Sequence, residues 1–205
     1  MRLGVLISGS GRTLKNLIER IGDGRLQGVS IEVVVSSKGG VAGIDIARAA
    51  GLPVHVVERI NFRTDVSFSR AVTRAIIKHK AELVVMAGLL HRWKFPPEFK
   101  GRVLNIHPAL LPKFGGKGFY GHRVHKAVLA AGERESGCTV HFADLEYDHG
   151  PVILQRRVPV RRGDDPDSLA ARVFEAELKA YPEAIRRVAS GRILLIRGRI
   201  VPGSK

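Results

Sequence analysis

Short apolar runs alternate with segments of helical periodicity in the first half of the chain, and this alternation constrains the fold most strongly. The runs cover residues 3–8, 31–36, 54–57, 83–87 and 103–106. Between them, apolar residues recur at helical spacing in two sets: Leu14, Leu17, Ile18 and Ile21, then Phe68, Val72, Ala75 and Ile76. Strands that are continuously apolar suit a parallel sheet covered by helices on both faces.

The pattern changes after residue 110. A glycine-rich stretch is followed by a predicted helix near 122–131 and by two strand-like runs, 139–143 and 152–160, which favour an antiparallel addition to the sheet. A long helix is predicted from about residue 167, with Tyr181-Pro182 disturbing its course, and 192–201 is expected to form a last short strand. The predicted fold is α/β, a single Rossmann-like open, mostly parallel sheet with helices on both faces and an antiparallel C-terminal addition.

Length and composition indicate one ordinary globular domain. The 205 residues include 44% hydrophobic and 26% charged residues, so we expect a single domain over 1–205, with a core of about 1–190 and a short C-terminal extension. The single cysteine, Cys138, fits a reducing cytoplasm. No run is long enough for a signal peptide or a membrane span, so we expect a cytoplasmic protein with no membrane partner.

A net charge of +15 is the one unusual global property. Basic proteins often bind polyanions, but the Lys and Arg residues are scattered and form only short pairs such as Arg156-Arg157. This favours a solvated basic surface and no nucleic-acid partner. A basic nucleic-acid-binding module without catalysis remains the alternative from another class, and salt-sensitive binding to random oligonucleotides would favour it.

The run Ser8-Gly9-Ser10-Gly11-Arg12-Thr13 lies between the first predicted strand and the first predicted helix. Backbone N–H groups and the helix dipole at such a turn favour an anion, so the run is a candidate phosphate site, unless its glycines serve only to make the turn. It contains neither the Gly-x-Gly-x-x-Gly of dinucleotide sites nor the Gly-Lys-Ser/Thr of a P-loop. A dinucleotide-dependent oxidoreductase is therefore disfavoured.

Asn105 and His107 stand two residues apart at the end of an apolar strand. Side chains with a period of two project to the same side, and ligand crevices of open α/β sheets lie at the carboxyl ends of strands. An amide donor beside an imidazole suits a reaction in which an oxyanion develops while a proton moves; an isolated histidine hydrogen-bonded in a loop is the alternative. Asp148 precedes His149-Gly150-Pro151, where a purely conformational role is the default.

Three motifs in the same order resemble the folate-dependent formyltransferases: the Ser8-Gly9-Ser10-Gly11 start, the run Asn105-Ile106-His107-Pro108-Ala109-Leu110-Leu111-Pro112, and the stretch from Gly137 to Pro151. The resemblance covers about residues 1–190. It implies that the chain transfers a formyl group from the co-substrate 10-formyltetrahydrofolate to the glycine amine of 5-phosphoribosylglycinamide in purine synthesis. Both substrates are small molecules, and no metal is expected.

The resemblance also implies roles for individual residues. Asn105 is expected to polarise the formyl oxygen, His107 to act as general acid and oxyanion partner, and Asp148 to support the protonated imidazole. Phosphate and ribose binding is implied for Gly11, Arg12, Thr13 and Glu177. Folate binding, partly through backbone groups, is implied for Leu90, His91, Arg92, Trp93, Asp144, Leu145, Glu146 and Tyr147.

The sequence departs from the family pattern near the acceptor. Arg12-Thr13 stands where many members have Ser-Asn, and Phe174 where a polar residue often contacts the sugar nucleotide. The stretch between Trp93 and Asn105 is shortened, and residues 115–121 form a longer loop that is either a lid or an inert insertion. Another phosphorylated amine as acceptor therefore stays open. A formyltetrahydrofolate deformylase or a methionyl-tRNA formyltransferase is less expected, because those enzymes carry additional domains.

Overall fold

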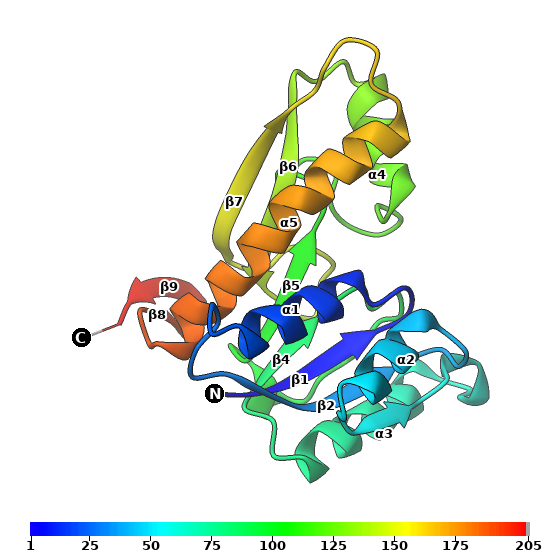
Figure 1. Cartoon of the computed structure of the whole chain (residues 1–205), viewed down its shortest axis with the longest axis vertical. Helices are drawn as coiled ribbons and strands as arrows, with labels where there is room; N and C mark the ends of the chain where they lie inside the picture. Colours follow the sequence, from blue (N-terminus) through cyan, green and yellow to red (C-terminus); the bar gives the residue numbers. More distant parts are fainter. Residues whose placement is uncertain (204–205) are drawn as a thin grey trace. The chain divides into compact units, whose positions relative to one another are not determined.

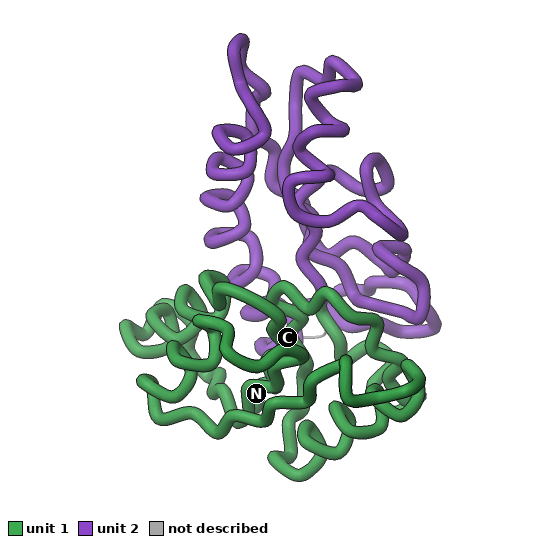
Figure 2. Tube along the Cα trace, turned by 90° about the vertical axis from the view of Figure 1, so that its right-hand side faces the viewer, with its two compact units in different colours: residues 1–104 green, residues 105–205 purple. Residues whose placement is uncertain are grey.

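The computed structural model describes residues 1–203 and divides into two compact units, residues 1–104 and residues 105 onward (Figure 2). Seven strands form one sheet in the order β3-β2-β1-β4-β5-β6-β7. The first unit contains β1 Arg2–Ile7, α1 Arg12–Gly22, β2 Ser30–Ser36, α2 Ala42–Ala49, β3 Val54–Val56, η1 Arg59–Asn61, α3 Asp65–Lys78, β4 Leu83–Met86 and η2 Pro97–Phe99 (Figure 1). Strand β5, Val103–His107, begins in the first unit and ends in the second.

The first unit is a parallel sheet. Strand β1 pairs in parallel with β2 and β4, and β2 pairs in parallel with β3. Five of the six residues of β1 are buried, as expected for a strand covered by helices on both faces. Helix α1 packs against α2, while α3 packs against β2. The carboxyl ends of β1, β2 and β4 consequently lie at one edge of the sheet. The loops that follow these three strands therefore lie close to one another.

The second unit contains the antiparallel addition. It comprises the end of β5, α4 His122–Ala130, β6 Glu135–Phe142, β7 Val152–Pro159, α5 Pro166–Ala189, β8 Ile193–Ile196 and β9 Arg199–Pro202. Strands β6 and β7 pair antiparallel, and α5 packs over both of them. The start of α5 is fixed by a capping box in which Asp165 accepts from the backbone of Ser168 and the Ser168 side chain accepts in return. Strands β6 and β7 and helix α5 thus form the support on which the end of β5 and the β6–β7 connection are held.

The predicted fold class is confirmed, and the five predicted parallel strands coincide with β1 to β5 within a residue or two. Two local expectations were wrong. Residues 192–201 form the hairpin β8-β9 rather than one strand, because Arg197 and Gly198 adopt left-handed backbone (φ 49° and 77°) and reverse the chain. Helix α5 continues through the buried Pro182 to Ala189 without interruption.

Helix α2 was not anticipated. It has only eight residues, and the second of them is a glycine, which disfavours a helix. None of the helices within residues 1–203 is both long and apolar enough to cross a membrane.

Candidate active site

The residues singled out from the sequence are divided between the two units. Those of the candidate phosphate loop (Gly11, Arg12, Thr13) and of the first folate segment (Leu90, His91, Arg92, Trp93) belong to the first unit. Those of the candidate catalytic trio (Asn105, His107, Asp148), together with Glu177 and the second candidate folate segment (Asp144, Leu145, Glu146, Tyr147), belong to the second. Each group is described within its own unit.

The structure brings Asn105, His107 and Asp148 together. Strand periodicity directs the first two to one side of β5, and the β6–β7 connection carries Asp148 to them. Asp148 Oδ2 lies 3.3 Å from His107 Nδ1, and Asp148 Oδ1 accepts a hydrogen bond of 3.2 Å from Asn105 Nδ2. Asp148 has left-handed backbone, φ 53°, which is uncommon outside glycine and frequent at functional sites.

A fourth side chain, His141 near the end of β6, completes the group. It is 1% exposed, and its Nε2 lies 3.1 Å from Asn105 Nδ2. Because an amide NH₂ can only donate, Nε2 of His141 is the acceptor and its Nδ1–H donates to the carbonyl of Phe142 at 3.0 Å. His141 thereby orients the amide of Asn105. Sequence reasoning missed it, although it lies in the run that resembles the formyltransferases.

The chain after β5 folds back onto the trio. The carbonyl oxygen of Phe114 lies 2.7 Å from His107 Nε2, and the backbone N–H of Gly116 donates to Asp148 Oδ2 at 3.0 Å. Phe114 has left-handed backbone, φ 57°. A Cβ on Gly115 would overlap the side chain of Leu111 and approach Cβ of Asp148 to 3.3 Å, so a larger residue in this turn would force these two side chains to shift.

The segment that leads into this turn is fixed by buried hydrogen bonds. Thr139 Oγ1 donates to the carbonyl of Ala109 at 2.6 Å and accepts from the N–H of Leu111 at 3.0 Å. Gln155 Nε2 donates to the carbonyl of Leu111 at 2.9 Å. Side chains from β6 and β7 therefore set the path along which the chain leaves His107.

Opposing effects act on the ionisation of His107. Both of its ring nitrogens face oxygen acceptors, an arrangement that only the imidazolium satisfies fully. Burial nevertheless lowers the pKa of His107, while the carboxylate of Asp148 and the carbonyl of Phe114 act in the opposite direction. The expected influence of Asp148 is present, but burial outweighs it. A proton on His107 is consequently held weakly enough to be given away.

Asp148 stays ionised beside this imidazole. Burial by itself would raise the pKa of Asp148, but His141, the charge of His107 and the N–H of Gly116 together hold it below its ordinary value. The site therefore combines an amide donor, a titratable imidazole and a buried carboxylate, a set that can stabilise an oxyanion and move a proton.

The candidate phosphate loop starts helix α1. Gly11 is the N-cap residue with left-handed backbone, φ 70°, and the first turn contains no acidic side chain. Because a glycine N-cap has no side chain to accept from the first N–H groups, those groups and the helix dipole suit an anion. Arg12 is exposed and Thr13 half-buried.

The same loop rests on α2, through a residue that the sequence did not single out. Gly43 donates its N–H to the carbonyl of Gly9 at 3.1 Å. A Cβ on Gly11 would lie 2.5 Å from Gly43 Cα, and a Cβ on Gly43 would lie 2.9 Å from the oxygen of Gly9. The two facing glycines, Gly11 and Gly43, thus allow the loop to approach α2 closely. Gly43 could have been singled out from the sequence only if helix α2 had been predicted.

The first candidate folate segment has one exposed and one buried end. Leu90 is 54% exposed, whereas Trp93 is 4% exposed and its indole N–H donates to Thr73 Oγ1 at 3.1 Å. Between them His91 is half-buried and Arg92 exposed. Backbone and side-chain groups near Leu90 and His91 are therefore better placed for a ligand than the ring of Trp93, which packs into the core.

The second candidate folate segment is an exposed turn. Asp144 Oδ1 accepts from the N–H of Glu146 at 2.8 Å, an interaction typical of Asx turns, while Leu145 and Tyr147 are 52% and 46% exposed. Asp144 Oδ2 also lies 2.8 Å from Nδ1 of His149, and this hydrogen bond raises the pKa of His149. The segment presents apolar side chains on a hydrogen-bonded turn.

Glu177 lies half-buried on α5, the helix that packs over β6. Cys138 on β6 is fully buried, and its pKa is raised to about 12 by burial and by the charge of Glu177. The carboxylate therefore faces the sheet side of α5, unlike an ordinary exposed helix carboxylate. Phe174, one turn earlier, is also half-buried.

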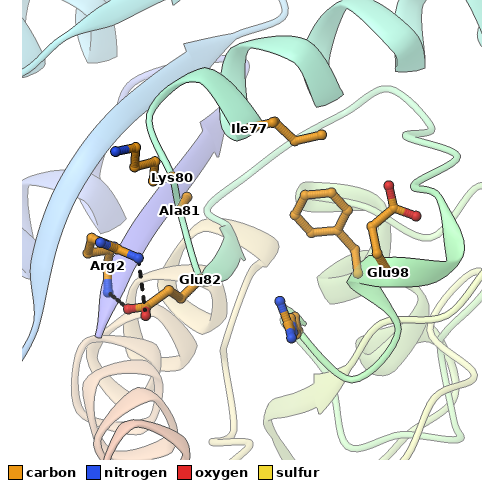
Figure 3. A pocket seen from close by; sticks show the side chains of 8 residues that line it. Arg2, Ile77, Lys80, Ala81, Glu82 and Glu98 are labelled. Carbon is orange, nitrogen blue, oxygen red and sulfur yellow. Dashed lines mark hydrogen bonds and ion pairs between the residues drawn. The ribbon is translucent and has the colours of Figure 1, made fainter.

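A hollow of about 420 Å³ in the first unit lies away from these groups (Figure 3). Its lining includes Arg2 at the start of β1, Glu82 directly before β4 and Arg102 directly before β5. These positions mark the amino ends of the strands, the edge opposite to the candidate ligand loops.

Within residues 1–203, no group of three or more His, Cys, Asp or Glu side chains is arranged to hold a metal ion.

Comparison with known proteins places these features in one family. The formyl transferase family matches residues 1–185. The trifunctional purine biosynthetic protein adenosine-3 of Gallus gallus is 40% identical over 195 residues, which are 94% of this chain and 19% of that protein. The chloroplastic phosphoribosylglycinamide formyltransferase of Arabidopsis thaliana is 39% identical over 197 residues, 94% of this chain and 66% of that protein.

Solved structures agree with the sequence comparison. The crystal structure of glycinamide ribonucleotide transformylase 1 from Symbiobacterium toebii superposes with a TM-score of 0.92 at 34% identity, covering 100% of this chain and 94% of that chain. This chain thus spans nearly all of a solved relative, but only a small part of the trifunctional proteins.

Proposed function

Because this chain belongs to the formyl transferase family, we propose that it transfers a formyl group from 10-formyltetrahydrofolate to the glycine amine of 5-phosphoribosylglycinamide. The observation that carries this proposal is the cluster at the end of β5, where Asp148 lies 3.3 Å from His107 and 3.2 Å from Asn105. The names of the relatives at 39% and 40% identity support the choice of reaction.

The chemistry proceeds by addition and elimination at the formyl carbon. The acceptor amine attacks that carbon, and the formyl oxygen becomes an oxyanion stabilised by the amide N–H of Asn105 and by the imidazolium of His107. The bond between the formyl carbon and the folate nitrogen then breaks, and His107 protonates the leaving nitrogen. Asp148 stabilises the imidazolium and helps to accept the proton that the amine loses.

Two rearrangements must accompany binding. Both amide hydrogens of Asn105 are directed at protein acceptors, His141 Nε2 and Asp148 Oδ1, so the formyl oxygen must take over one of them. The carbonyl of Phe114 faces His107 Nε2 and must move aside for the imidazole to reach the substrate. We therefore propose that the loop over residues 115–121 acts as a lid and that the adjoining Phe114 moves with it.

Substrate binding is assigned to the predicted segments. Backbone groups of Gly11, Arg12 and Thr13 at the start of α1 would hold the phosphate, and Glu177 the ribose. The pterin would contact the backbone of the two folate segments, Leu90 to Trp93 and Asp144 to Tyr147. The left-handed Gly11, the uncapped helix start and the exposed turn at Asp144 support these assignments. No metal takes part in the proposed reaction.

A related acceptor is the second candidate, and a specific observation favours it. The half-buried Phe174 lies on the same helix as Glu177. Its side chain offers no hydrogen-bonding group to a sugar nucleotide. A panel of phosphorylated amines, assayed at equal concentration, separates the two: phosphoribosylglycinamide should give the highest kcat/KM. A different amine that exceeds it tenfold would replace it as the substrate.

We further propose that residues 1–205 work as one formyltransferase domain, in the cytoplasm and on small molecules rather than nucleic acid. The single buried cysteine, Cys138, supports a reducing compartment. The chloroplastic relative shows that the family is not confined to one location.

The proposed function is tested by following consumption of 10-formyltetrahydrofolate by the purified protein, with and without phosphoribosylglycinamide. We expect turnover only when the amine is present. Equal turnover without the amine would make the protein a deformylase, and binding of random oligonucleotides without any turnover would favour the nucleic-acid-binding alternative.

A further inference from the structure

A chain of hydrogen bonds joins the carboxyl ends of three parallel strands in the first unit. The N–H of Leu90, after β4, donates to Ser8 Oγ, after β1, at 2.9 Å. Ser8 Oγ lies 2.6 Å from Ser37 Oγ, after β2, and Ser37 Oγ lies 3.0 Å from Nδ1 of His91. Ser8 and Ser37 are each 3% exposed, so water competes little for these bonds.

The chain has a preferred direction. The backbone N–H of Leu90 can only donate, so Ser8 Oγ accepts from it and directs its own O–H to Ser37. Ser37 then donates to Nδ1 of His91, which must be the unprotonated nitrogen of a neutral ring. If His91 were protonated, Nδ1–H would donate to Ser37, the Ser37 hydroxyl would turn toward Ser8, and the proton of Ser8 would lose its partner in the chain.

The surroundings of His91 favour the neutral ring. Its ring meets Phe68 on α3 edge-on, with centroids 6.2 Å apart. Burial lowers the pKa of His91, and the charges of Lys38 and Arg59 act in the same direction. Asp65 acts in the opposite direction but is paired with Arg59 at 2.7 Å.

We infer that His91 is a positioning residue for the folate substrate. Through Ser37 and Ser8 it holds the backbone at Leu90 and His91 next to the Gly9–Thr13 loop, and it does so only as a neutral imidazole. This inference rests on the proposed function, because it assigns the positioned backbone to the pterin. It predicts that folate affinity falls as the pH decreases, independently of the chemistry at His107.

The test measures the dissociation constant of tetrahydrofolate through the fluorescence of Trp93, which is the only tryptophan of the chain and lies two residues from His91. For the wild-type protein the constant should rise about three- to tenfold between about pH 8 and about pH 5, the effect of losing one hydrogen bond. His91→Asn keeps an acceptor near the position of Nδ1 that cannot be protonated, so it should bind nearly as tightly and with a flat pH profile. His91→Leu should bind weakly at every pH.

A matched pair of serine variants separates positioning from general damage. Ser37→Ala removes the middle link and should raise the dissociation constant at about pH 8 as much as His91→Leu does. Ser36→Ala removes a neighbouring buried hydroxyl that bonds the carbonyl of Lys38 in its own turn, and it should leave folate affinity unchanged. The kcat at saturating folate should be nearly the same for Ser37→Ala, Ser36→Ala and the wild type, because neither hydroxyl takes part in the proposed proton transfers.

These measurements distinguish a failure of the role inferred for His91 from a failure of the proposed function. A wild-type protein that neither binds tetrahydrofolate nor turns over formyl folate would overturn both proposals. A wild-type protein that turns over normally but binds folate with a flat pH profile would overturn only the role of His91. A pH profile of His91→Asn that matches the wild type would do the same, because it would assign the titration to another group, such as His149, which is hydrogen-bonded to Asp144 of the second folate segment.

Discussion

The carbonyl oxygen of Phe114 lies 2.7 Å from Nε2 of His107, while Asp148 approaches the other ring nitrogen at 3.3 Å. The imidazole that the proposed mechanism uses as an acid is therefore held on both sides by the protein. In the proposed mechanism, access of the substrate to this imidazole depends on the turn around Phe114, and Gly116 in the same turn donates its N–H to Asp148. Loop position and acid strength are thus linked, because removing the carbonyl removes one of the groups that favour the imidazolium.

Removing the carboxylate or the imidazole should abolish most of the activity. We expect Asp148→Asn and His107→Ala each to lower kcat by about 10²- to 10⁴-fold, the usual size of a general acid–base contribution. Circular dichroism and thermal unfolding should show an intact fold. Near-normal turnover in either variant would refute the assigned site.

Crowding the turn next to Asp148 should lower activity without touching a reacting group. A Cβ in Gly115→Ala would overlap Leu111 and press on Asp148, so we expect kcat to fall about tenfold and stability by about 1 kcal/mol. Gly22→Ala is the matched control, because a Cβ there meets nothing within 4 Å. Steady-state kinetics and thermal melts check both variants, and equal kinetics in the two would argue against the linkage.

The parallel half of the fold was predictable because its strands are buried on both faces and appear as continuous apolar runs. The candidate site could be predicted only in part. Strand periodicity placed Asn105 beside His107, but the 3.3 Å approach of Asp148 depends on a long-range connection that spacing does not encode. The contact of Phe114 requires left-handed backbone at a phenylalanine, which no sequence pattern indicates. His141 was missed because its partner depends on how neighbouring strands align.

The facing glycines of the phosphate loop give a separate prediction. In Gly43→Ala the new Cβ would lie 2.7 Å from Ile7 Cδ1 and 2.9 Å from the oxygen of Gly9, so the Gly9–Gly11 backbone must shift. We expect the KM for phosphoribosylglycinamide to rise about tenfold and stability to fall by about 1–3 kcal/mol. The dissociation constant of tetrahydrofolate serves as the internal control; a fall in folate affinity as large as that in acceptor affinity would contradict a local effect on the phosphate loop.

His125 on α4 should make the fold sensitive to acid. It is 4% exposed and its Nδ1 has no hydrogen-bond partner among the described residues; burial, with the charges of His122 and His107, lowers its pKa to about 4. The unfolded chain, with a pKa of about 6.5, therefore binds more protons between these values, and stability falls as the pH decreases through this window. The loss should be of the order of 3 kcal/mol.

Replacing this histidine isolates its contribution. His125→Leu removes the titrating group, so urea unfolding should show a smaller loss of stability between about pH 6.5 and about pH 4 than in the wild type. At about pH 8, where the histidine is neutral in both states, the two proteins should differ much less. Parallel pH profiles of the free energy of unfolding would assign the acid sensitivity to another group.

The buried thiol provides a probe of global unfolding. Cys138 is fully buried and its pKa is raised to about 12, so the reactive thiolate is scarce and inaccessible in the native protein. We expect a disulfide reagent to leave the native protein unmodified and to label one thiol per chain once urea unfolds it. Fast labelling of the native protein would contradict the packing of α5 over β6.

The transfer itself is tested most directly with 10-formyltetrahydrofolate that carries a ¹³C label in its formyl group, supplied together with phosphoribosylglycinamide to the purified protein. Mass spectrometry and ¹³C NMR then locate the label. The proposed function predicts that the label appears on the glycine nitrogen of the acceptor in amounts equal to the tetrahydrofolate formed, and that His107→Ala suppresses both products together. Label recovered only as free formate, or retained on the folate, would contradict it.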